Sequence, residues 1–123
     1  MTLDFARIAA AACSSKTLEE TVVLDVGDLI SITDYFVITS GRNDRQVRAI
    51  VDEVTRQCRA AGLGPARQVE GLNEARWVLL DFGIFVVHVF EAEARQYYGL
   101  ERLWADATRV SWEAEMAADR AGN

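Results

Sequence analysis

The chain has 123 residues; half are hydrophobic, 26% are charged, and only 1 is proline. That length suits one domain with a single core, and the composition excludes a disordered or fibrous protein. The net charge of −6 at pH 7 argues against direct binding of nucleic acid, which relies on lysine and arginine to neutralise phosphates, and favours a basic partner.

The first part of the chain predicts a helix followed by two strands. Apolar residues recur at helical spacing over residues 3–15. Residues 21–26 alternate in the manner of a strand, and residues 27–34 read as a connecting loop. The β-branched and aromatic run 35–39 is too short for a helix, so it predicts a second, buried strand.

A long amphipathic helix follows, with Asn43 or Asp44 as its cap and Gly62 at its end. Its apolar residues share one face, and the opposite face carries arginines at positions 45, 48, 56 and 59. Such a stripe can contact nucleic acid. The net charge favours the other interpretation, a solvated helix face on which arginine pairs with aspartate and glutamate.

The second half of the chain predicts four further elements: a short strand at 68–70, strands at 77–81 and 84–90, and a helix at 91–98. Gly99 interrupts the helical pattern, and one more turn follows it. The periodicity is lost from residue 108 onward, so we expect one domain over residues 1–106 and a tail, either a loose helix or disordered, over 107–123. The element order α-β-β-α-β-β-β-α predicts an α/β sandwich with a mixed sheet.

The two strands within residues 77–90 predict two different sheet faces. Alternation places a wholly apolar set on the core side: Val78, Leu80, Phe85, Val87 and Val89. The other face is either covered by the C-terminal helix or offered to a partner, and it carries Trp77, Leu79, Asp81, Ile84, Val86 and His88. A two-residue turn at Phe82-Gly83 would pair Trp77 with His88. Phenylalanine fits poorly where φ must be positive, and a longer turn would shift this pairing without exchanging the faces.

Two side chains of this second face have both a structural and a functional interpretation. Trp77 suits packing and binding equally, because tryptophan is frequent in cores and in interface hot spots. His88 is better explained as a hydrogen-bonded structural residue than as a catalytic base. Downstream, aromatic and apolar residues crowd around Gly99: Tyr97, Tyr98, Leu100, Leu103 and Trp104. An exposed aromatic patch flanked by carboxylates would suit a basic, partly apolar protein surface.

Membrane insertion and secretion are both disfavoured. The longest apolar run, residues 82–87, is far shorter than the roughly 20 residues of a membrane-spanning helix. Asp4 and Arg7 interrupt the N-terminal segment, which makes it a poor signal peptide. We therefore expect a cytoplasmic protein with no membrane partner.

The metal-binding residue types are too few for a typical zinc site. Cys13 and Cys58 are isolated in the sequence, and His88 is the single histidine. We therefore expect no metal and no cofactor. Both cysteines are interpreted as small core residues in a reducing compartment.

Catalytic signatures are also weak. The chain has no P-loop, no dinucleotide-binding glycine motif and no strand with paired carboxylates for Mg²⁺. Ser40-Gly41, between a strand and a helix, could hold a phosphate, although a turn with a capping residue explains it better. One alternative is therefore a nucleotidyltransferase-like enzyme that uses Ser40-Gly41 for phosphate and Asp81 for metal. Another is a dimeric scaffold for some other partner.

Several unusual blocks nevertheless occur in order and at characteristic separations: residues 25–26, 31–41, 45–47, 70–71, 77–83, 86–90 and 95–104. Over roughly residues 3–106 the chain resembles the ribosomal silencing factor S, or Iojap, family. This resemblance implies a small α/β protein with a nucleotidyltransferase-like fold that lacks the catalytic carboxylates, and it implies that the protein is not an enzyme.

The resemblance also implies a function and a partner. Members bind the large ribosomal subunit through ribosomal protein fourteen on its intersubunit face, which blocks joining of the small subunit when nutrients are short. Carried over by motif, the partner-binding residues would be Trp77, Leu79, Asp81, His88, Arg95, Tyr98, Leu100 and Trp104. Family members also tend to form homodimers, so a homodimer is expected for the free protein.

Overall fold

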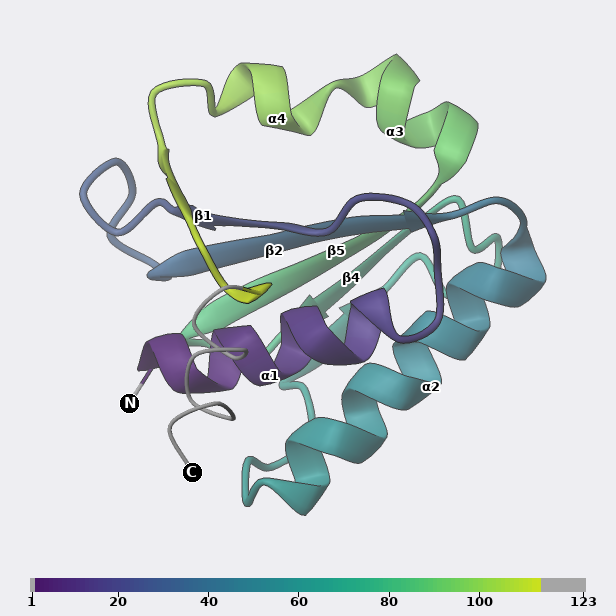
Figure 1. Cartoon of the computed structure of the whole chain (residues 1–123), viewed down its shortest axis with the longest axis horizontal. Coiled ribbons are helices and arrows are strands. Elements are labelled where there is room, and N and C mark those ends of the chain that lie inside the picture. Colours follow the sequence, from purple (N-terminus) through teal and green to yellow (C-terminus); the bar gives the residue numbers. More distant parts are fainter. Residues whose placement is uncertain (1, 114–123) are drawn as a thin grey trace.

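The computed structural model describes residues 2–113, which form a six-stranded sheet between two helical layers (Figure 1). The elements in chain order are α1 (Thr2–Ser14), β1 (Val22–Asp25), β2 (Tyr35–Gly41), α2 (Asp44–Ala60), β3 (Gln68–Glu70), β4 (Trp77–Asp81), β5 (Phe85–Glu91), α3 (Ala92–Tyr98), α4 (Leu100–Leu103) and β6 (Thr108–Val110). Helices α1 and α2 lie on one face of the sheet, and α3 and α4 lie on the other.

The sheet is mixed, as the element order predicted. Its strands lie in the order β3-β4-β5-β2-β1-β6. The central pair β2 and β5 is parallel, and every other neighbouring pair is antiparallel. Strands β2 and β5 are buried along nearly their whole length, which explains their continuous β-branched and aromatic composition. The α/β class is confirmed, whereas the likeness to nucleotidyltransferases stays a prediction.

Helix α2 begins where its capping signal predicted. The Asn43 side chain accepts a hydrogen bond from the backbone N–H of Gln46 at 2.9 Å. Two of its four solvent-facing arginines pair with acidic neighbours on the same helix, Arg48 with Asp44 and Arg56 with Glu53. These pairs agree with the solvated-face interpretation of the arginine stripe.

The core between the sheet and α1/α2 is mainly aliphatic, with the rings of Phe82 and Phe85 stacked inside it. The five residues assigned to this face of the hairpin are each at most 1% exposed: Val78, Leu80, Phe85, Val87 and Val89. Cys13 and Cys58 are free thiols buried in the same cluster, as the sequence predicted. The sequence therefore identified this face of the hairpin correctly.

The predicted register of the hairpin is wrong by two residues. Trp77 lies opposite Phe90, and His88 lies opposite Leu79. The tip of the hairpin is Gly83-Ile84, because Phe82 donates its N–H to the carbonyl of Phe85 at 3.0 Å. The physical reason is that the tip requires a positive φ. Gly83 adopts a φ of 86° without strain, whereas Phe82 would be strained in that conformation. The assignment of residues to the two faces is unchanged.

The C-terminal part confirms one sequence prediction and contradicts another. As predicted, Gly99, whose φ is 59°, separates helix α3 from the single further turn α4. Residues 108–110, expected to belong to a tail or loose helix, form β6 and pair with β1. Trp112 then donates its indole N–H to the carbonyl of Thr21 at 3.0 Å. A three-residue strand shows no periodicity, so only its partner in the fold reveals it. The prediction for residues 114–123 lies outside the described residues.

Within residues 2–113, no helix is long and apolar enough to cross a membrane.

Candidate functional site

The sheet face that carries Trp77 is covered by α3 and α4. Their contact with the sheet buries a second cluster: Val22, Leu24, Val26, Phe36, Ile38, Val86, Phe90, Ala94 and Leu100. Trp77, Leu79 and Trp104 pack against this cluster and remain partly exposed. Of the two alternatives for this face, the chain's own helices cover most of it, so a partner can reach only its margin.

An aromatic patch forms that margin, and we define it as Trp77, Tyr97 and Tyr98. The ring centroids of Trp77 and Tyr98 are 4.9 Å apart, and those of Tyr97 and Tyr98 are 5.1 Å apart. Tyr97 is 78% exposed and Tyr98 is 46% exposed, a high exposure for aromatic side chains in mutual contact. The patch therefore combines large apolar area with accessibility, as binding anchors do.

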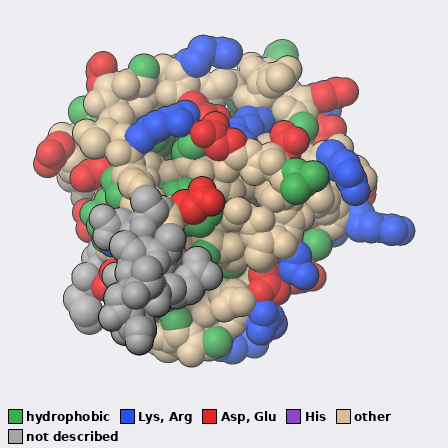
Figure 2. All heavy atoms as spheres, viewed as in Figure 1, with side chains coloured by type: hydrophobic (Ala, Val, Ile, Leu, Met, Phe, Trp, Pro, Cys, Tyr) green, Lys and Arg blue, Asp and Glu red, His purple; other side chains and the backbone are tan. Residues whose placement is uncertain are grey.

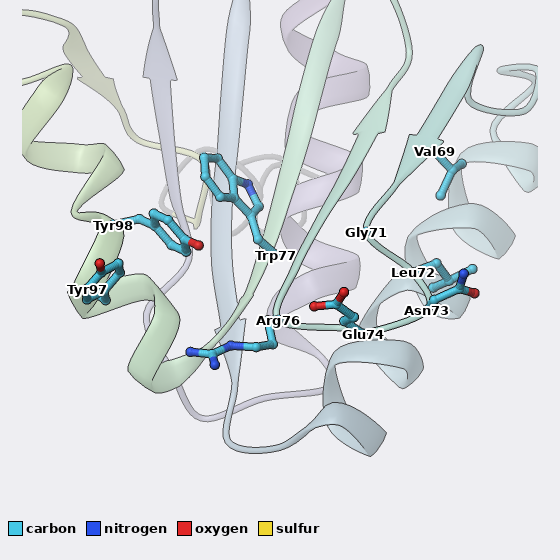
Figure 3. A pocket seen from close by; sticks show the side chains of 9 residues that line it. All are labelled: Val69, Gly71, Leu72, Asn73, Glu74, Arg76, Trp77, Tyr97 and Tyr98. Carbon is cyan, nitrogen blue, oxygen red and sulfur yellow. The ribbon is translucent and has the colours of Figure 1, made fainter.

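The patch forms one wall of a groove of about 820 Å³ (Figure 3). Tyr97 and Tyr98 come from α3, Trp77 opens β4, and the opposite wall is the connection that runs from β3 to β4. The lining residues are Val69, Gly71, Leu72, Asn73, Glu74, Arg76, Trp77, Tyr97 and Tyr98. Val69 and Leu72 are 46% and 42% exposed, so the groove has apolar contacts on both walls.

Gly71 allows the groove walls to approach each other. Its φ is 83°, and a Cβ at this position would collide with the backbone carbonyl of Trp77. Only glycine tolerates both conditions. The sequence pointed to Gly71 as part of a family block, but it did not indicate that the segment around it and α3 line the same groove.

Trp77 and His88 are joined by a hydrogen bond. The indole Nε1–H donates to Nδ1 of His88 at 3.1 Å. His88 is only 4% exposed, and burial lowers the pKa of its imidazole to about 4, so the ring is neutral at pH 7. These observations agree with the structural interpretation of His88, and they keep the ring itself out of reach of a partner.

Arg95 points inward, away from solvent. Its Nε donates to Glu101 at 2.8 Å, and its Nη1 donates to the Ser40 hydroxyl at 2.9 Å and to the Glu20 carbonyl at 2.6 Å. We call these four residues the arginine clasp. The Arg95 guanidinium ties α3 and α4 to β2 and to the segment before β1. The Arg95 side chain is 13% exposed. This geometry fits fastening of the helices better than contact with a partner.

Asp81 is separated from the aromatic patch by the length of β4. Its carboxylate accepts a hydrogen bond from the Gly83 N–H at 2.7 Å and lies 3.8 Å from Arg67. It therefore stabilises the hairpin tip. The structure places the eight predicted partner-binding residues differently. Trp77 and Tyr98 meet at the groove, Leu79 and Trp104 are partly exposed beside the buried cluster, and Asp81 lies at the far end of β4. His88 and Leu100 are buried, and Arg95 belongs to the arginine clasp.

The residues of the enzymatic alternative do not converge. Ser40 is fully buried inside β2, where its hydroxyl accepts from Arg95, and Asn43 next to it caps α2. Ser40 lies beside Phe90 in the sheet, whereas Asp81 pairs with Val86 near the other end of β5. Among residues 2–113, no group of three or more His, Cys, Asp and Glu side chains could hold a metal ion.

Charged side chains surround α3 and α4 without forming a patch of one sign. Figure 2 shows acidic and basic side chains interspersed over the face that these helices form at the top of the view. On this face, the acidic excess of the chain therefore forms no patch of one sign. A basic partner would be attracted to the whole protein, while the aromatic patch would define where it binds.

Comparison with known proteins adds independent information. Residues 2–123 match the family described as "Ribosomal silencing factor during starvation". A protein named ribosomal silencing factor RsfS from Bacillus subtilis is 46% identical over 101 residues, which cover 82% of this chain and 85% of that protein. The mouse protein named "Mitochondrial assembly of ribosomal large subunit protein 1" is 33% identical over 109 residues, which cover 85% of this chain and 46% of the mouse protein.

Two crystal structures share the fold. A protein from Chromobacterium violaceum superimposes with a TM-score of 0.81 at 30% sequence identity, over 85% of this chain and 87% of that one. A protein from Bacillus halodurans superimposes with a TM-score of 0.76 at 35% identity, over 89% of this chain and 98% of that one. The arrangement of sheet and helices is thus shared with solved relatives.

Proposed function

Because the chain belongs to the ribosomal silencing factor family, we propose that it binds the large ribosomal subunit and prevents the small subunit from joining it when nutrients are short. The description of the family and the name of one relative support this proposal. The family is described as acting during starvation, and the name of the mouse relative refers to assembly of the large subunit. The contact on the large subunit in this proposal is ribosomal protein fourteen, on the face that receives the small subunit.

The single observation that carries the proposal is the exposed aromatic patch. Trp77 and Tyr98 pack against each other at the margin of a buried face, and Tyr97 projects beyond them. Rigid aromatic side chains give large contact area at low cost in conformational entropy, which makes them the usual anchors of protein interfaces. A partner strand, loop or helix could bury the patch and fill the groove beside it.

The charge of the chain agrees with a ribosomal protein as partner. Ribosomal proteins that bind RNA are generally basic, and this chain carries six more acidic than basic residues. Long-range attraction would speed the encounter, whereas the buried aromatic contacts would hold the complex. We therefore expect the affinity to fall only modestly as salt rises, because salt screens the charges and leaves the apolar contacts.

The mechanism in this proposal is occlusion, without a chemical step. A folded body of 13.7 kDa bound to the intersubunit face would occupy space that the small subunit needs. The side chains that act are those that bind: the aromatic patch and the apolar residues of the opposite groove wall, Val69 and Leu72. The proposal includes action in the cytoplasm, where bacterial ribosomes lie, and a homodimer of the free chain.

Co-sedimentation with separated ribosomal subunits tests this function. We expect the wild-type chain to sediment with large subunits and not with small ones. Y98A should weaken this binding by about 2 kcal/mol, because it removes an anchor of the patch. I32A is the matched control, since Ile32 is 81% exposed in the loop between β1 and β2. Equal binding of wild type and Y98A would exclude the patch, and capture of a different partner alone would favour a general scaffold.

A further inference from the structure

Trp77 and His88 form a pair whose geometry goes beyond ordinary packing. They lie on neighbouring antiparallel strands and point to the same face, with His88 opposite Leu79 and Trp77 opposite Phe90. The indole N–H reaches Nδ1 of His88 at 3.1 Å across this diagonal. The one polar atom of the indole is thus bound to His88, a buried residue that does not line the groove.

The hydrogen bond fixes where the proton of the imidazole lies. An indole nitrogen only donates, so Nδ1 of His88 must be the acceptor and the ring proton must sit on Nε2. Nε2 is buried and has no hydrogen-bond partner in the part of the chain that the structure describes. The ring is surrounded instead by aromatic neighbours, with its centroid 4.6 Å from that of Phe36 and 6.4 Å from that of Phe90.

This arrangement is unfavourable for stability alone. A buried N–H without an acceptor destabilises the fold, and an apolar side chain of similar volume would avoid that loss. The histidine therefore needs another explanation, and the only polar contact described for its side chain within residues 2–113 is the one with Trp77. What the ring provides is an acceptor at one defined point beneath the indole.

The acceptor determines which of its two flipped orientations the indole adopts beside the groove. Figure 3 shows the Trp77 ring beside Tyr98, with the indole nitrogen on the side away from Tyr98. Stacking on Phe90 at 4.9 Å and contact with Tyr98 at 4.9 Å restrain the plane of the ring. Stacking alone does not distinguish the two flipped orientations of the indole, whereas a hydrogen bond to one edge does.

We propose that His88 is a positioning residue for large-subunit binding, which acts through Trp77 by holding the indole in the one orientation in which its N–H is bound within the protein. This inference rests on the proposed function. His88 is 4% exposed and does not touch the partner; its effect reaches the partner through the orientation of Trp77 and the shape of the aromatic patch.

Matched variants of His88 separate positioning from packing. H88N keeps a side-chain oxygen close to the place of Nδ1, whereas H88F and the smaller H88L remove the acceptor and also the orphaned N–H. Each variant is measured in two ways: affinity for isolated large subunits, and the nuclear magnetic resonance of the Trp77 indole N–H in the free protein. W77F identifies that resonance and provides the background in which His88 has nothing to position.

We expect H88F and H88L to fold and to bind large subunits about tenfold more weakly, because the anchor loses its orientation. H88N should restore affinity to within about threefold of wild type, since it restores the acceptor. In the W77F background, H88F should cause no further loss. The indole N–H resonance should shift and exchange faster with solvent in H88F and H88L, but not in H88N.

Several results would overturn the inference. Wild-type affinity of H88F and H88L would show that the indole needs no positioning, and an equal loss with and without Trp77 would show that His88 acts by another route. Failure of both apolar variants to fold would show that the histidine is needed for stability. If the wild-type chain itself does not bind large subunits, the proposed function fails first, and the indole resonance then reports only on the free protein.

Discussion

The two faces of the sheet are covered by different means. On the α1/α2 face, two long helices pack small and mainly aliphatic residues against the sheet, and Ala6, Ala9, Ile50 and Val54 are all 0% exposed. On the α3/α4 face, the helices are short, aromatic rings join the aliphatic contacts, and the arginine clasp fastens the layer. The α1/α2 face thus contributes mainly stability, whereas the α3/α4 face carries the exposed aromatic patch at its margin.

The largest expected effect on stability lies on the α1/α2 face. Phe85 is fully buried there, so F85A should lower the free energy of unfolding by about 4 kcal/mol through lost apolar contact and a residual cavity. Denaturant titration measures the change. The affinity of the folded fraction for large subunits should stay unchanged, and a parallel loss of affinity would show that the two faces are not separate in function.

On the α3/α4 face, we expect His88 to govern how the free energy of unfolding depends on pH. Burial lowers the pKa of its imidazole from 6.5 to about 4, so the unfolded chain takes up this proton at a higher pH than the folded chain does. Proton uptake by the unfolded chain therefore costs the fold no stability above pH 6.5 and lowers the unfolding free energy as pH falls toward 4, by about 3 kcal/mol in total. Titration of unfolding free energy against pH for wild type and H88F isolates this contribution.

A difference of the opposite sign, with wild type gaining stability relative to H88F as pH falls, would contradict the neutral buried ring. Glu53 affects stability only at lower pH, because hydrogen bonds from Arg56 and Gln57 lower the pKa of its carboxyl to about 2. Its contribution is lost only below about pH 4.5 and is common to both proteins.

The arginine clasp should have an intermediate effect. R95M keeps much of the aliphatic stem but removes the hydrogen bonds to Glu101, Ser40 and Glu20, so we expect a loss of about 2 kcal/mol. Amide hydrogen exchange should rise in α3 and α4 and stay constant in α2. R102M is the control, because Arg102 is exposed on α4 and outside the clasp. Uniform acceleration over all helices would show that the clasp supports the whole fold.

The smallest effect on stability belongs to the outer edge of the patch. Tyr97 is 78% exposed, so Y97A should change the unfolding free energy by less than about 0.5 kcal/mol. Its affinity for large subunits should nevertheless fall measurably, since the side chain extends the apolar surface of the groove. Unchanged affinity would confine the binding site to Trp77 and Tyr98.

Local signals in the sequence explain which parts of the fold could be predicted. Helix α2 has an Asn43 cap and strong periodicity, and the alternation within β4 and β5 assigned their faces correctly. The register of the hairpin required the backbone conformation of Gly83, and β6 required its partner β1. Neither can be derived from a short segment by itself.

The sequence indicated residues of the candidate site but not their geometry. It placed Trp77 on one face of the hairpin and Tyr98 in a separate cluster around Gly99, and the contact between their rings appears only in the folded chain. The inward orientation of Arg95 could not be foreseen, because its partners Ser40 and Glu20 lie 55 and 75 residues away in the sequence. The opposite groove wall was missed for the same reason, since the connection between β3 and β4 meets α3 only in the folded chain.

A subunit-joining assay tests the central claim most directly. Large and small subunits are mixed with increasing amounts of wild-type protein, Y98A or I32A, and the fraction of joined ribosomes is followed by light scattering. The account predicts that wild type and I32A suppress joining, whereas Y98A does so only at a concentration about 30-fold higher, the equivalent of about 2 kcal/mol. Suppression by Y98A at the wild-type concentration would contradict the claim that the aromatic patch binds the large subunit.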